Sequence, residues 1–397
     1  MIDLKAARAA PDAFRSALAR KGAGEAFDEL LAADERWRAL IPRVDELRSR
    51  TKLKGKPTPE EREELQKVKT ELKEAEDALA AAEAERDAAL ALVPNPPHES
   101  SPAGDTEEDA VEIRRIGEPA AMEAAREHTE IGRFDMERAA RVSGARFGYI
   151  IGDSARVAMA LYLFALDHLS EAGFTPVIPP VLVREEAMYG TGFFPTDRSN
   201  IYALEADDLY LTGTSEVALA ALHTGEILEE LPLRYTGFST NFRREAGAAG
   251  KDTRGMFRVH QFNKVEMFVF IRPELSWGEH DHMLDLEERF VQALGLPYRV
   301  MNVAAGDLGA SAAKKYDIEA WFPFQERYRE VTSCSNTTDF QSRRLGIRYR
   351  SERGLEHPHT LNGTMVTDRA LIAILENFDG AVPEALHRYG APAEVRA

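Results

Sequence analysis

Apolar residues recur at alternating spacings of three and four positions along two stretches near the start of the chain. One stretch covers 30–47 and the other covers 65–93, and residues 54–59, which contain Gly and Pro, separate them. This spacing is typical of helices that pack one apolar face against a neighbouring helix. Because each apolar stripe needs a partner and the adjacent stripe is nearest, we expect an antiparallel helical hairpin over about 27–93.

The residues after the hairpin, 94–105, contain several Pro and Ser and are typical of a linker. We therefore expect an N-terminal domain over 1–105 and a second domain over 106–397. Helix-like and strand-like runs are interspersed in the second domain, at 155–172, 209–211, 265–271, 280–294, 298–303 and 369–377. Few of them alternate as βαβ units, which favours an α+β fold with a largely antiparallel sheet flanked by helices.

The formal net charge of −17 argues against a uniformly basic, nucleic-acid-binding protein. One stretch differs, because residues 43–56 carry six basic and two acidic side chains. This stretch falls at the expected tip of the hairpin. A nucleic-acid contact would explain the charge, and so would the solvated end of a dimerising coiled coil.

Several classes of protein are disfavoured by what the sequence lacks. There is no run of eighteen apolar residues and no apolar signal core at the start, so we expect a cytoplasmic protein without a membrane span. Cys334 is the only cysteine, which excludes an internal disulfide framework and a multi-cysteine zinc site. His280 and His282 lie two apart on an expected helix, hence on different faces, and do not predict a zinc site.

The sequence has no phosphate-binding loop of the Walker or GxGxxG type, so arginines and carboxylates on a sheet would have to hold any nucleotide. Arg243 and Glu245 lie two apart and would share one face of a strand. Arg258, Phe262 and Glu266 have matching parity and would line another. Together they could bind phosphate, stack on a base and bind an ammonium group. Taken singly, a surface ion pair and a core phenylalanine are the simpler interpretations.

The segments 240–245 and 258–268 resemble the second signature motif of class II aminoacyl-tRNA synthetases. Segment 173–180 resembles the first motif and segment 360–377 the third. With the hairpin and further ordered matches, the chain is similar to the seryl-tRNA synthetase family of the bacterial type. Those further matches lie at 211–216, 250–254, 259–266 and 327–335. The fold implied by this resemblance is the class II antiparallel sheet flanked by helices, with an N-terminal coiled-coil arm.

The resemblance implies that the chain activates L-serine with ATP to seryl-adenylate and transfers serine to tRNA(Ser), with tRNA(Sec) as a further acceptor. The implied serine-binding residues are Thr214, Ser215, Glu216, Arg243, Glu266, Asn362 and Thr364. The implied ATP-binding residues are Arg243, Arg244, Glu245, Arg258, Val259, Phe262, Glu330, Val331, Thr332, Ser333 and Arg369. Arg243, Glu330 and Arg369 are the implied catalytic residues. Mg²⁺ would accompany ATP at Glu330 and Ser333, and zinc is not implied.

The arm of this family grips tRNA, and its first motif builds a homodimer interface. The implied tRNA contacts are Arg48, Arg50, Lys52, Lys54 and Lys56. Between Thr364 and Arg369 the third motif is one residue shorter than the family's usual pattern. This leaves open a divergent paralogue that supplies seryl groups to, or protects, a natural-product pathway. A ligase acting on a carrier protein and a catalytically silent tRNA-binding paralogue also remain open.

Overall fold

The computed structural model describes residues 1–52, 58–122, 124–246, 252 and 255–396. The chain divides into two compact units, Met1–Pro96 and Pro97–Ala397. The division falls before the boundary that we expected near residue 105, because the residues in between hydrogen bond within the larger unit. The amide of His98 donates to the carbonyl of Ala313 (2.8 Å), and the amide of Ala305 donates to the carbonyl of Pro102 (2.9 Å).

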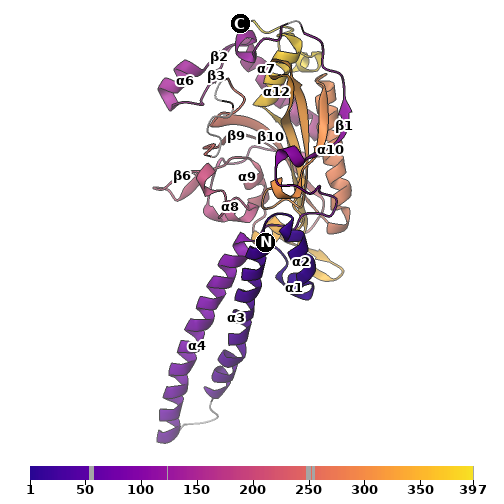
Figure 1. Cartoon of the computed structure of the whole chain (residues 1–397). Helices are drawn as coiled ribbons and strands as arrows, with labels where there is room; N and C mark the ends of the chain where they lie inside the picture. The colour runs from indigo at the N-terminus through magenta and orange to yellow at the C-terminus, as the bar shows by residue number, and fades with distance from the viewer. Residues whose placement is uncertain (53–57, 123, 247–251, 253–254, 397) are drawn as a thin grey trace. The chain divides into compact units, whose positions relative to one another are not determined.

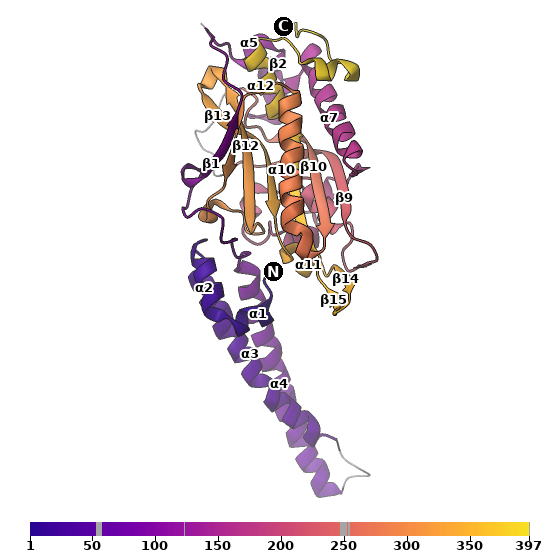
Figure 2. The ribbon, with the colours of Figure 1, turned by 90° about the vertical axis from the view of Figure 1, so that its right-hand side faces the viewer.

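The N-terminal unit contains the expected helical hairpin. Its helices are α1 (Leu4–Ala9), α2 (Pro11–Ala19), α3 (Gly24–Arg50) and α4 (Pro59–Leu92). Figures 1 and 2 show α3 and α4 side by side, and residues of the predicted stripe such as Leu30, Leu47 and Val68 are buried. A capping box at Thr58 and Glu61 begins α4, with hydrogen bonds of 2.7 and 3.2 Å. The hairpin predicted from the apolar spacing is therefore confirmed.

The larger unit is built, among its described residues, around an eight-stranded sheet in the order β1-β11-β12-β13-β16-β10-β9-β4. Its strands are β1 (Val111–Ile116), β4 (Thr175–Val177), β9 (Leu233–Phe242), β10 (Gln261–Ile271), β11 (Tyr298–Asn302), β12 (Lys314–Phe322), β13 (Arg327–Asn336) and β16 (His359–Thr367). Neighbouring strands are antiparallel except β4 and β9, which run parallel. The prediction of an α+β fold with a largely antiparallel sheet is confirmed.

Three long helices cover the sheet: α7 (Asp153–Glu171), α10 (Ser276–Ala293) and α12 (Asp368–Phe378). Figure 2 shows α10 in front of the sheet, running roughly along its strands. The two faces of the sheet pack against different apolar clusters, as strand β10 illustrates. Successive side chains of a strand point to opposite faces of its sheet. Met267, Val269 and Ile271 join the main apolar core with these helices. Phe268 and Phe270 belong to a second cluster, which includes α9 (Glu216–Ala221).

Shorter elements surround this sheet. The helices are α5 (His128–Ile131), α6 (Met136–Ser143), α8 (Glu185–Thr191) and α11 (Phe340–Arg344). The strands are β2 (Phe134–Asp135), β3 (Tyr149–Ile150), β5 (Leu182–Val183), β6 (Tyr202–Leu204), β7 (Leu209–Leu211), β8 (Ile227–Leu228), β14 (Arg348–Ser351) and β15 (Gly354–Glu356). None of the described helices is both long and apolar enough to cross a membrane.

Candidate functional site

A cavity of about 470 Å³ lies on the large sheet, between side chains of β10, β13 and β16 and the first turn of α12. It gathers most of the residues implied by the sequence. These are Thr214, Glu216, Arg243, Glu245, Arg258, Val259, Phe262, Glu266, Glu330, Val331, Thr332, Ser333, Asn362, Thr364 and Arg369. Two expected residues are left out. The hydroxyl of buried Ser215 donates to the carbonyl of Gly237 (3.3 Å), and the Arg244 guanidinium lies 5.8 Å from the ring centroid of Tyr202.

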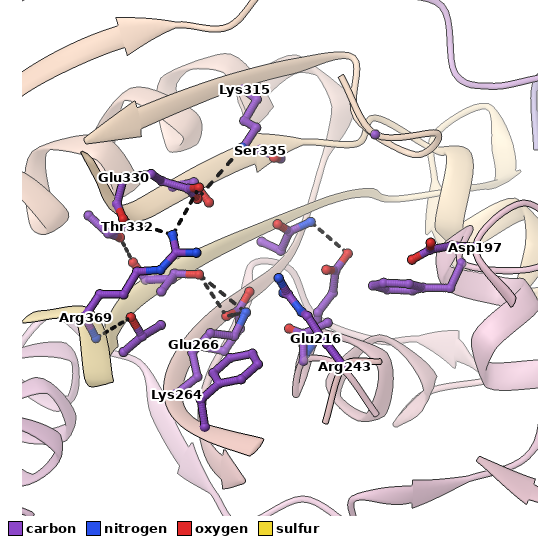
Figure 3. Close-up of a pocket in the computed structure, with 18 of the residues that line it drawn as sticks. Asp197, Glu216, Arg243, Lys264, Glu266, Lys315, Glu330, Thr332, Ser335 and Arg369 are labelled. Atoms are coloured by element: carbon purple, nitrogen blue, oxygen red, sulfur yellow. Dashed lines mark hydrogen bonds and ion pairs between the residues drawn. The ribbon is translucent and has the colours of Figure 1, made fainter. Parts of the chain in front are cut away.

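One end of the cavity is acidic and buried (Figure 3). Glu266 pairs with Lys264, and the hydroxyl of Thr364 donates to Glu266 Oε2 (3.4 Å). Glu266 and Thr364 face each other on β10 and β16, where a register shift follows Val265. Burial raises the pKa of Glu266 to about 7, although the Lys264 ammonium opposes the shift. This carboxyl is therefore held in a cation-paired site from which water is largely excluded.

A second carboxyl, Glu216, lies in the same end of the cavity. Its Oε1 accepts hydrogen bonds from Gln341 Nε2 (2.8 Å) and from Asn362 Nδ2 (2.9 Å). Burial raises the pKa of Glu216, while the Gln341 hydrogen bond and the charge of Lys264 lower it. The charge of Arg243 lowers the pKa of Glu216 as well, so this end of the cavity places two buried carboxyls beside the cations Lys264 and Arg243. Such a site suits a small ligand with an ammonium group.

The other end of the cavity carries arginines. Arg258 pairs with Glu245 (2.6 Å), and Arg369 donates to the Glu330 carbonyl (3.0 Å) and to Glu330 Oε2 (3.4 Å). The Arg243 guanidinium lies 5.1 Å from the ring centroid of Phe262. Three guanidinium groups that line one cavity beside an aromatic ring suit a phosphorylated ligand with a base.

Glu330 lies between two cations at this end, as Figure 3 shows. Its Oε2 is 3.4 Å from Arg369 Nη1, and its Oε1 is 4.0 Å from Lys315 Nζ. Burial alone would raise the pKa of Glu330, but the charges of Lys315, Arg369 and Arg243 outweigh it and lower the pKa to about 2. The carboxylate is therefore ionised at every physiological pH.

Glu330 and Ser333 both line the cavity, and carboxylate and hydroxyl oxygens are ligands that Mg²⁺ accepts. The described residues hold no group of three or more His, Cys, Asp or Glu side chains able to bind a metal. A Mg²⁺ at Glu330 and Ser333 would take its remaining ligands from phosphates and water.

Lys264 and Lys315 also line the cavity, and neither was predicted as a site residue from the sequence. Lys264 had a detectable signal, because it lies midway between Phe262 and Glu266 and shares their parity. Lys315 had none. It belongs to β12, where it pairs with Asp317 (2.8 Å), and only the pairing of β12 with β13 brings it to the cavity.

The predicted tRNA-contact residues lie in the N-terminal unit, where two of the three described ones pair with glutamates of α4. Arg48 pairs with Glu76 (2.9 Å) and Arg50 pairs with Glu64 (3.1 Å). Lys52 is exposed, and Lys54 and Lys56 lie outside the described residues. Charge counting along 43–56 overlooked the glutamates that the second helix places beside these arginines.

Comparison with known proteins gives consistent matches over both units. Residues 1–97 match the family described as the seryl-tRNA synthetase N-terminal domain. Residues 202–378 match the tRNA synthetase class II core domain (G, H, P, S and T). A serine–tRNA ligase of Mycolicibacterium vanbaalenii is 50% identical over 410 residues, covering 98% of each chain. One of Acidothermus cellulolyticus is 48% identical over 411 residues, again covering 98% of each.

Solved structures agree with the sequence matches. The crystal structure of seryl-tRNA synthetase from Pyrococcus horikoshii complexed with ATP has a TM-score of 0.93 and 39% identity, covering 100% of this chain and 99% of the other. The cytoplasmic serine–tRNA ligase from Naegleria fowleri in complex with AMP has a TM-score of 0.88 and 35% identity, covering 98% and 96%.

Proposed function

The chain belongs to the seryl-tRNA synthetase family, and from this premise we propose how its cavity performs the reaction of a serine–tRNA ligase. The enzyme activates L-serine with ATP and transfers the seryl group to tRNA(Ser). The observation that carries the assignment of roles is the polarity of the cavity. Two buried carboxyls and Lys264 occupy one end, and Arg258, Arg369 and the ionised Glu330 occupy the other. The charge of Arg243, which lies beside Glu216 in Figure 3, acts on Glu216 and on Glu330.

Serine binds at the acidic end. Glu266 and Glu216 supply the negative charge that the serine ammonium group needs. Lys264 neutralises part of that charge before serine binds. Thr364, Asn362 and Thr214 add polar groups around the serine hydroxyl. Alanine leaves those buried groups without a partner, so such a site rejects it strongly.

ATP binds at the arginine end. Phe262 offers a ring for the adenine to stack on, and Glu245 offers a carboxylate to its amino group. Arg243, Arg258 and Arg369 bind the phosphates, because a guanidinium donates two parallel hydrogen bonds and keeps its charge when buried.

The reaction then needs positioning and charge neutralisation rather than a protein nucleophile. The serine carboxylate attacks the α-phosphate, the bond to the β-phosphate breaks, and pyrophosphate leaves. A ribose hydroxyl at the end of tRNA then attacks the seryl carbonyl and AMP leaves. Arg243 and Arg369 hold the phosphates in line for attack, and Glu330 with Ser333 would hold Mg²⁺, which neutralises phosphate charge when bound.

The N-terminal hairpin and a second subunit complete the proposal. Arg48, Arg50 and Lys52 contact phosphates of the tRNA, which the protein recognises by shape. A second copy of the chain covers an apolar surface on α7 and around the first motif. Met159 and Leu163 are 54% and 46% exposed on one side of α7, and Ile178 is 90% exposed.

Three competing functions are less favoured. A silent paralogue predicts lost charges at the cavity, yet Arg243, Glu330 and Arg369 are all present there. If the protein were a carrier-protein ligase, the hairpin would have no role. The hypothesis of a specialised paralogue is supported only by the shortened third motif. Activity toward tRNA(Sec) and a cytoplasmic location stay predictions.

The first test is pyrophosphate–ATP exchange with each of the twenty amino acids, followed by charging of total tRNA. We expect exchange with serine alone and charging of tRNA(Ser). Serine exchange without charging would redirect the proposal to another acceptor. No exchange with any amino acid would overturn it.

A further inference from the structure

His128 and Glu376 are buried polar residues that do not line the cavity and take no part in the proposed mechanism. His128, the first residue of α5, is 3% exposed, and the Glu376 side chain on α12 is fully buried. Burying two polar side chains together is costly unless hydrogen bonds compensate. Their partners therefore indicate what they stabilise.

The two ring nitrogens of His128 bind different elements. The Met256 amide donates to Nε2 (3.1 Å), so Nε2 carries no proton. The proton is therefore on Nδ1, which donates to Glu376 Oε1 (3.0 Å). Within the described part of the chain, the other oxygen of Glu376 has no hydrogen-bond partner. The neutral imidazole thus links the segment around Met256 to helix α12.

The histidine is held tightly in this position. A Cβ atom added at Gly255 would lie 2.6 Å from His128 Cε1, closer than any real contact. The Phe134 ring meets the imidazole edge-on, with centroids 5.6 Å apart. Close packing on both sides leaves the ring little freedom to follow a shift of either partner.

Both linked elements lead directly to the arginine end of the cavity. Met256 begins the run through Phe257 to Arg258, and all three line the cavity. Helix α12 carries Arg369 in its first turn, and the Arg369 guanidinium lies 4.6 Å from the Phe257 ring centroid. A shift of one element against the other would therefore separate the two cations that we assign to the phosphates.

We propose that His128 is a positioning residue for ATP, which fixes the segment carrying Arg258 to the helix carrying Arg369. The inference rests on the proposed function, because it takes both arginines as phosphate ligands. His128 acts through these arginines and does not touch the nucleotide itself. Its loss should weaken ATP binding and leave serine binding unchanged, since Glu216 and Glu266 belong to other elements.

Two isosteric variants separate the two hydrogen bonds. In His128→Asn the amide nitrogen replaces Nδ1 and retains the bond to Glu376, while the bond from Met256 is lost. In His128→Gln the amide oxygen replaces Nε2 and retains the bond from Met256, while the bond to Glu376 is lost. His168→Asn is the matched control, because it removes a histidine that contacts the Leu286 carbonyl (3.2 Å) between α7 and α10.

The readouts are the Kd for ATP by calorimetry without serine, the KM values for ATP and serine in pyrophosphate exchange, and the melting temperature. We expect each His128 variant to raise Kd and KM for ATP about tenfold, as for one lost buried hydrogen bond. For the His128 variants, KM for serine should stay within about twofold of the parent value. The control His168→Asn should change neither ATP binding nor KM for serine. An unchanged Kd for ATP, or equal rises in both KM values, would overturn the proposal.

If the His128 variants do not fold, variants of Glu376 test the same proposal. Glu376→Gln keeps an oxygen facing Nδ1 and should bind ATP like the parent, whereas Glu376→Met should bind it about tenfold more weakly. Equal ATP binding by both, or failure of both to fold, would assign the pair to folding alone and overturn the proposal. A parent that binds ATP without serine-dependent exchange would contradict the proposed function instead, and the ATP Kd would still test His128.

Discussion

Lys264 and Glu266 form a buried ion pair from the same face of strand β10, in the acidic part of the cavity. Their side chains are 7% and 2% exposed, so water contributes little to balancing either charge. Glu216 lies close enough to raise the pKa of Glu266 further. Lys264 therefore compensates the charge of Glu266, and Arg243 helps to compensate that of Glu216, when no ammonium ligand is bound.

Replacing Lys264 should damage both stability and serine binding. Lys264→Met leaves the buried carboxyl of Glu266 without its paired cation, and breaking a buried pair costs about 3 kcal/mol. We expect the free energy of unfolding in urea to fall by about that amount. KM for serine at neutral pH should rise, because the charge of Lys264 lowers the pKa of Glu266 and its loss favours the protonated carboxyl, which cannot pair with an ammonium group. Lys67→Met is the control, because the Lys67–Glu63 pair (3.8 Å) is 66% and 79% exposed and should change stability by under about 0.5 kcal/mol. Equal effects of the two substitutions would contradict this interpretation.

Serine binding should depend on pH through Glu266, whose pKa burial raises to about 7. Below this value the carboxyl is protonated and cannot pair with the ammonium group, and above it the carboxylate can. We therefore expect KM for serine to fall as pH rises from about 6 to 8 and then to level off. Exchange rates over serine concentration at each pH measure this. Glu266→Gln should show a high KM that does not change over this range, and a parent KM that rises with pH would refute the assignment.

Glu330 should set the Mg²⁺ requirement. Glu330→Gln removes an anionic ligand and leaves Arg369 and Lys315 without the carboxylate between them. We expect the exchange rate to fall on the order of 100-fold and the half-saturating Mg²⁺ concentration to rise. Titrating Mg²⁺ at fixed ATP measures both. Glu319→Gln is the matched control, because Glu319 faces Glu330 on the neighbouring strand and pairs with Arg299 (2.6 Å) instead.

The hairpin arginines should act on tRNA alone. Arg48→Gln is expected to raise KM for tRNA several-fold and to make charging less sensitive to salt, while pyrophosphate exchange stays unchanged. Glu76→Gln should have the opposite effect on KM, because it frees Arg48 from its partner at 2.9 Å. Arg36→Gln, which breaks a similar pair with Glu85 (2.6 Å) outside the predicted contact, is the control. A change in serine-dependent exchange would show that the arm affects more than tRNA.

The sequence predicted those features that depend on local periodicity. Alternating spacing placed α3 and α4, and parity along β10 placed Phe262 and Glu266 in one cavity. The expectation that Arg258, Arg243 and Glu245 lie on strands was wrong, because β9 ends at Phe242 and β10 begins at Gln261, although all three line the cavity. The same parity contains Lys264, which was not singled out as a site residue although it lines the cavity.

Contacts between distant segments could not be predicted in this way. Lys315 reaches the cavity only through the pairing of β12 with β13, and His128 reaches Glu376 across 248 positions of sequence. The glutamates beside Arg48 and Arg50 belong to a second helix, so a count of charge along one stretch missed them. Each of these features depends on which segments pack together, and no spacing in the chain encodes that.

Strand β10 places Glu266 in the cavity and its neighbours Val265 and Met267 in the main core. Recognition of the amino acid and resistance to unfolding are therefore encoded on a single strand, one residue apart. Any attempt to retarget this enzyme to another amino acid must reshape the cavity without shifting that strand. The melting temperature of each redesigned variant would consequently show whether specificity was changed locally or at the cost of the fold.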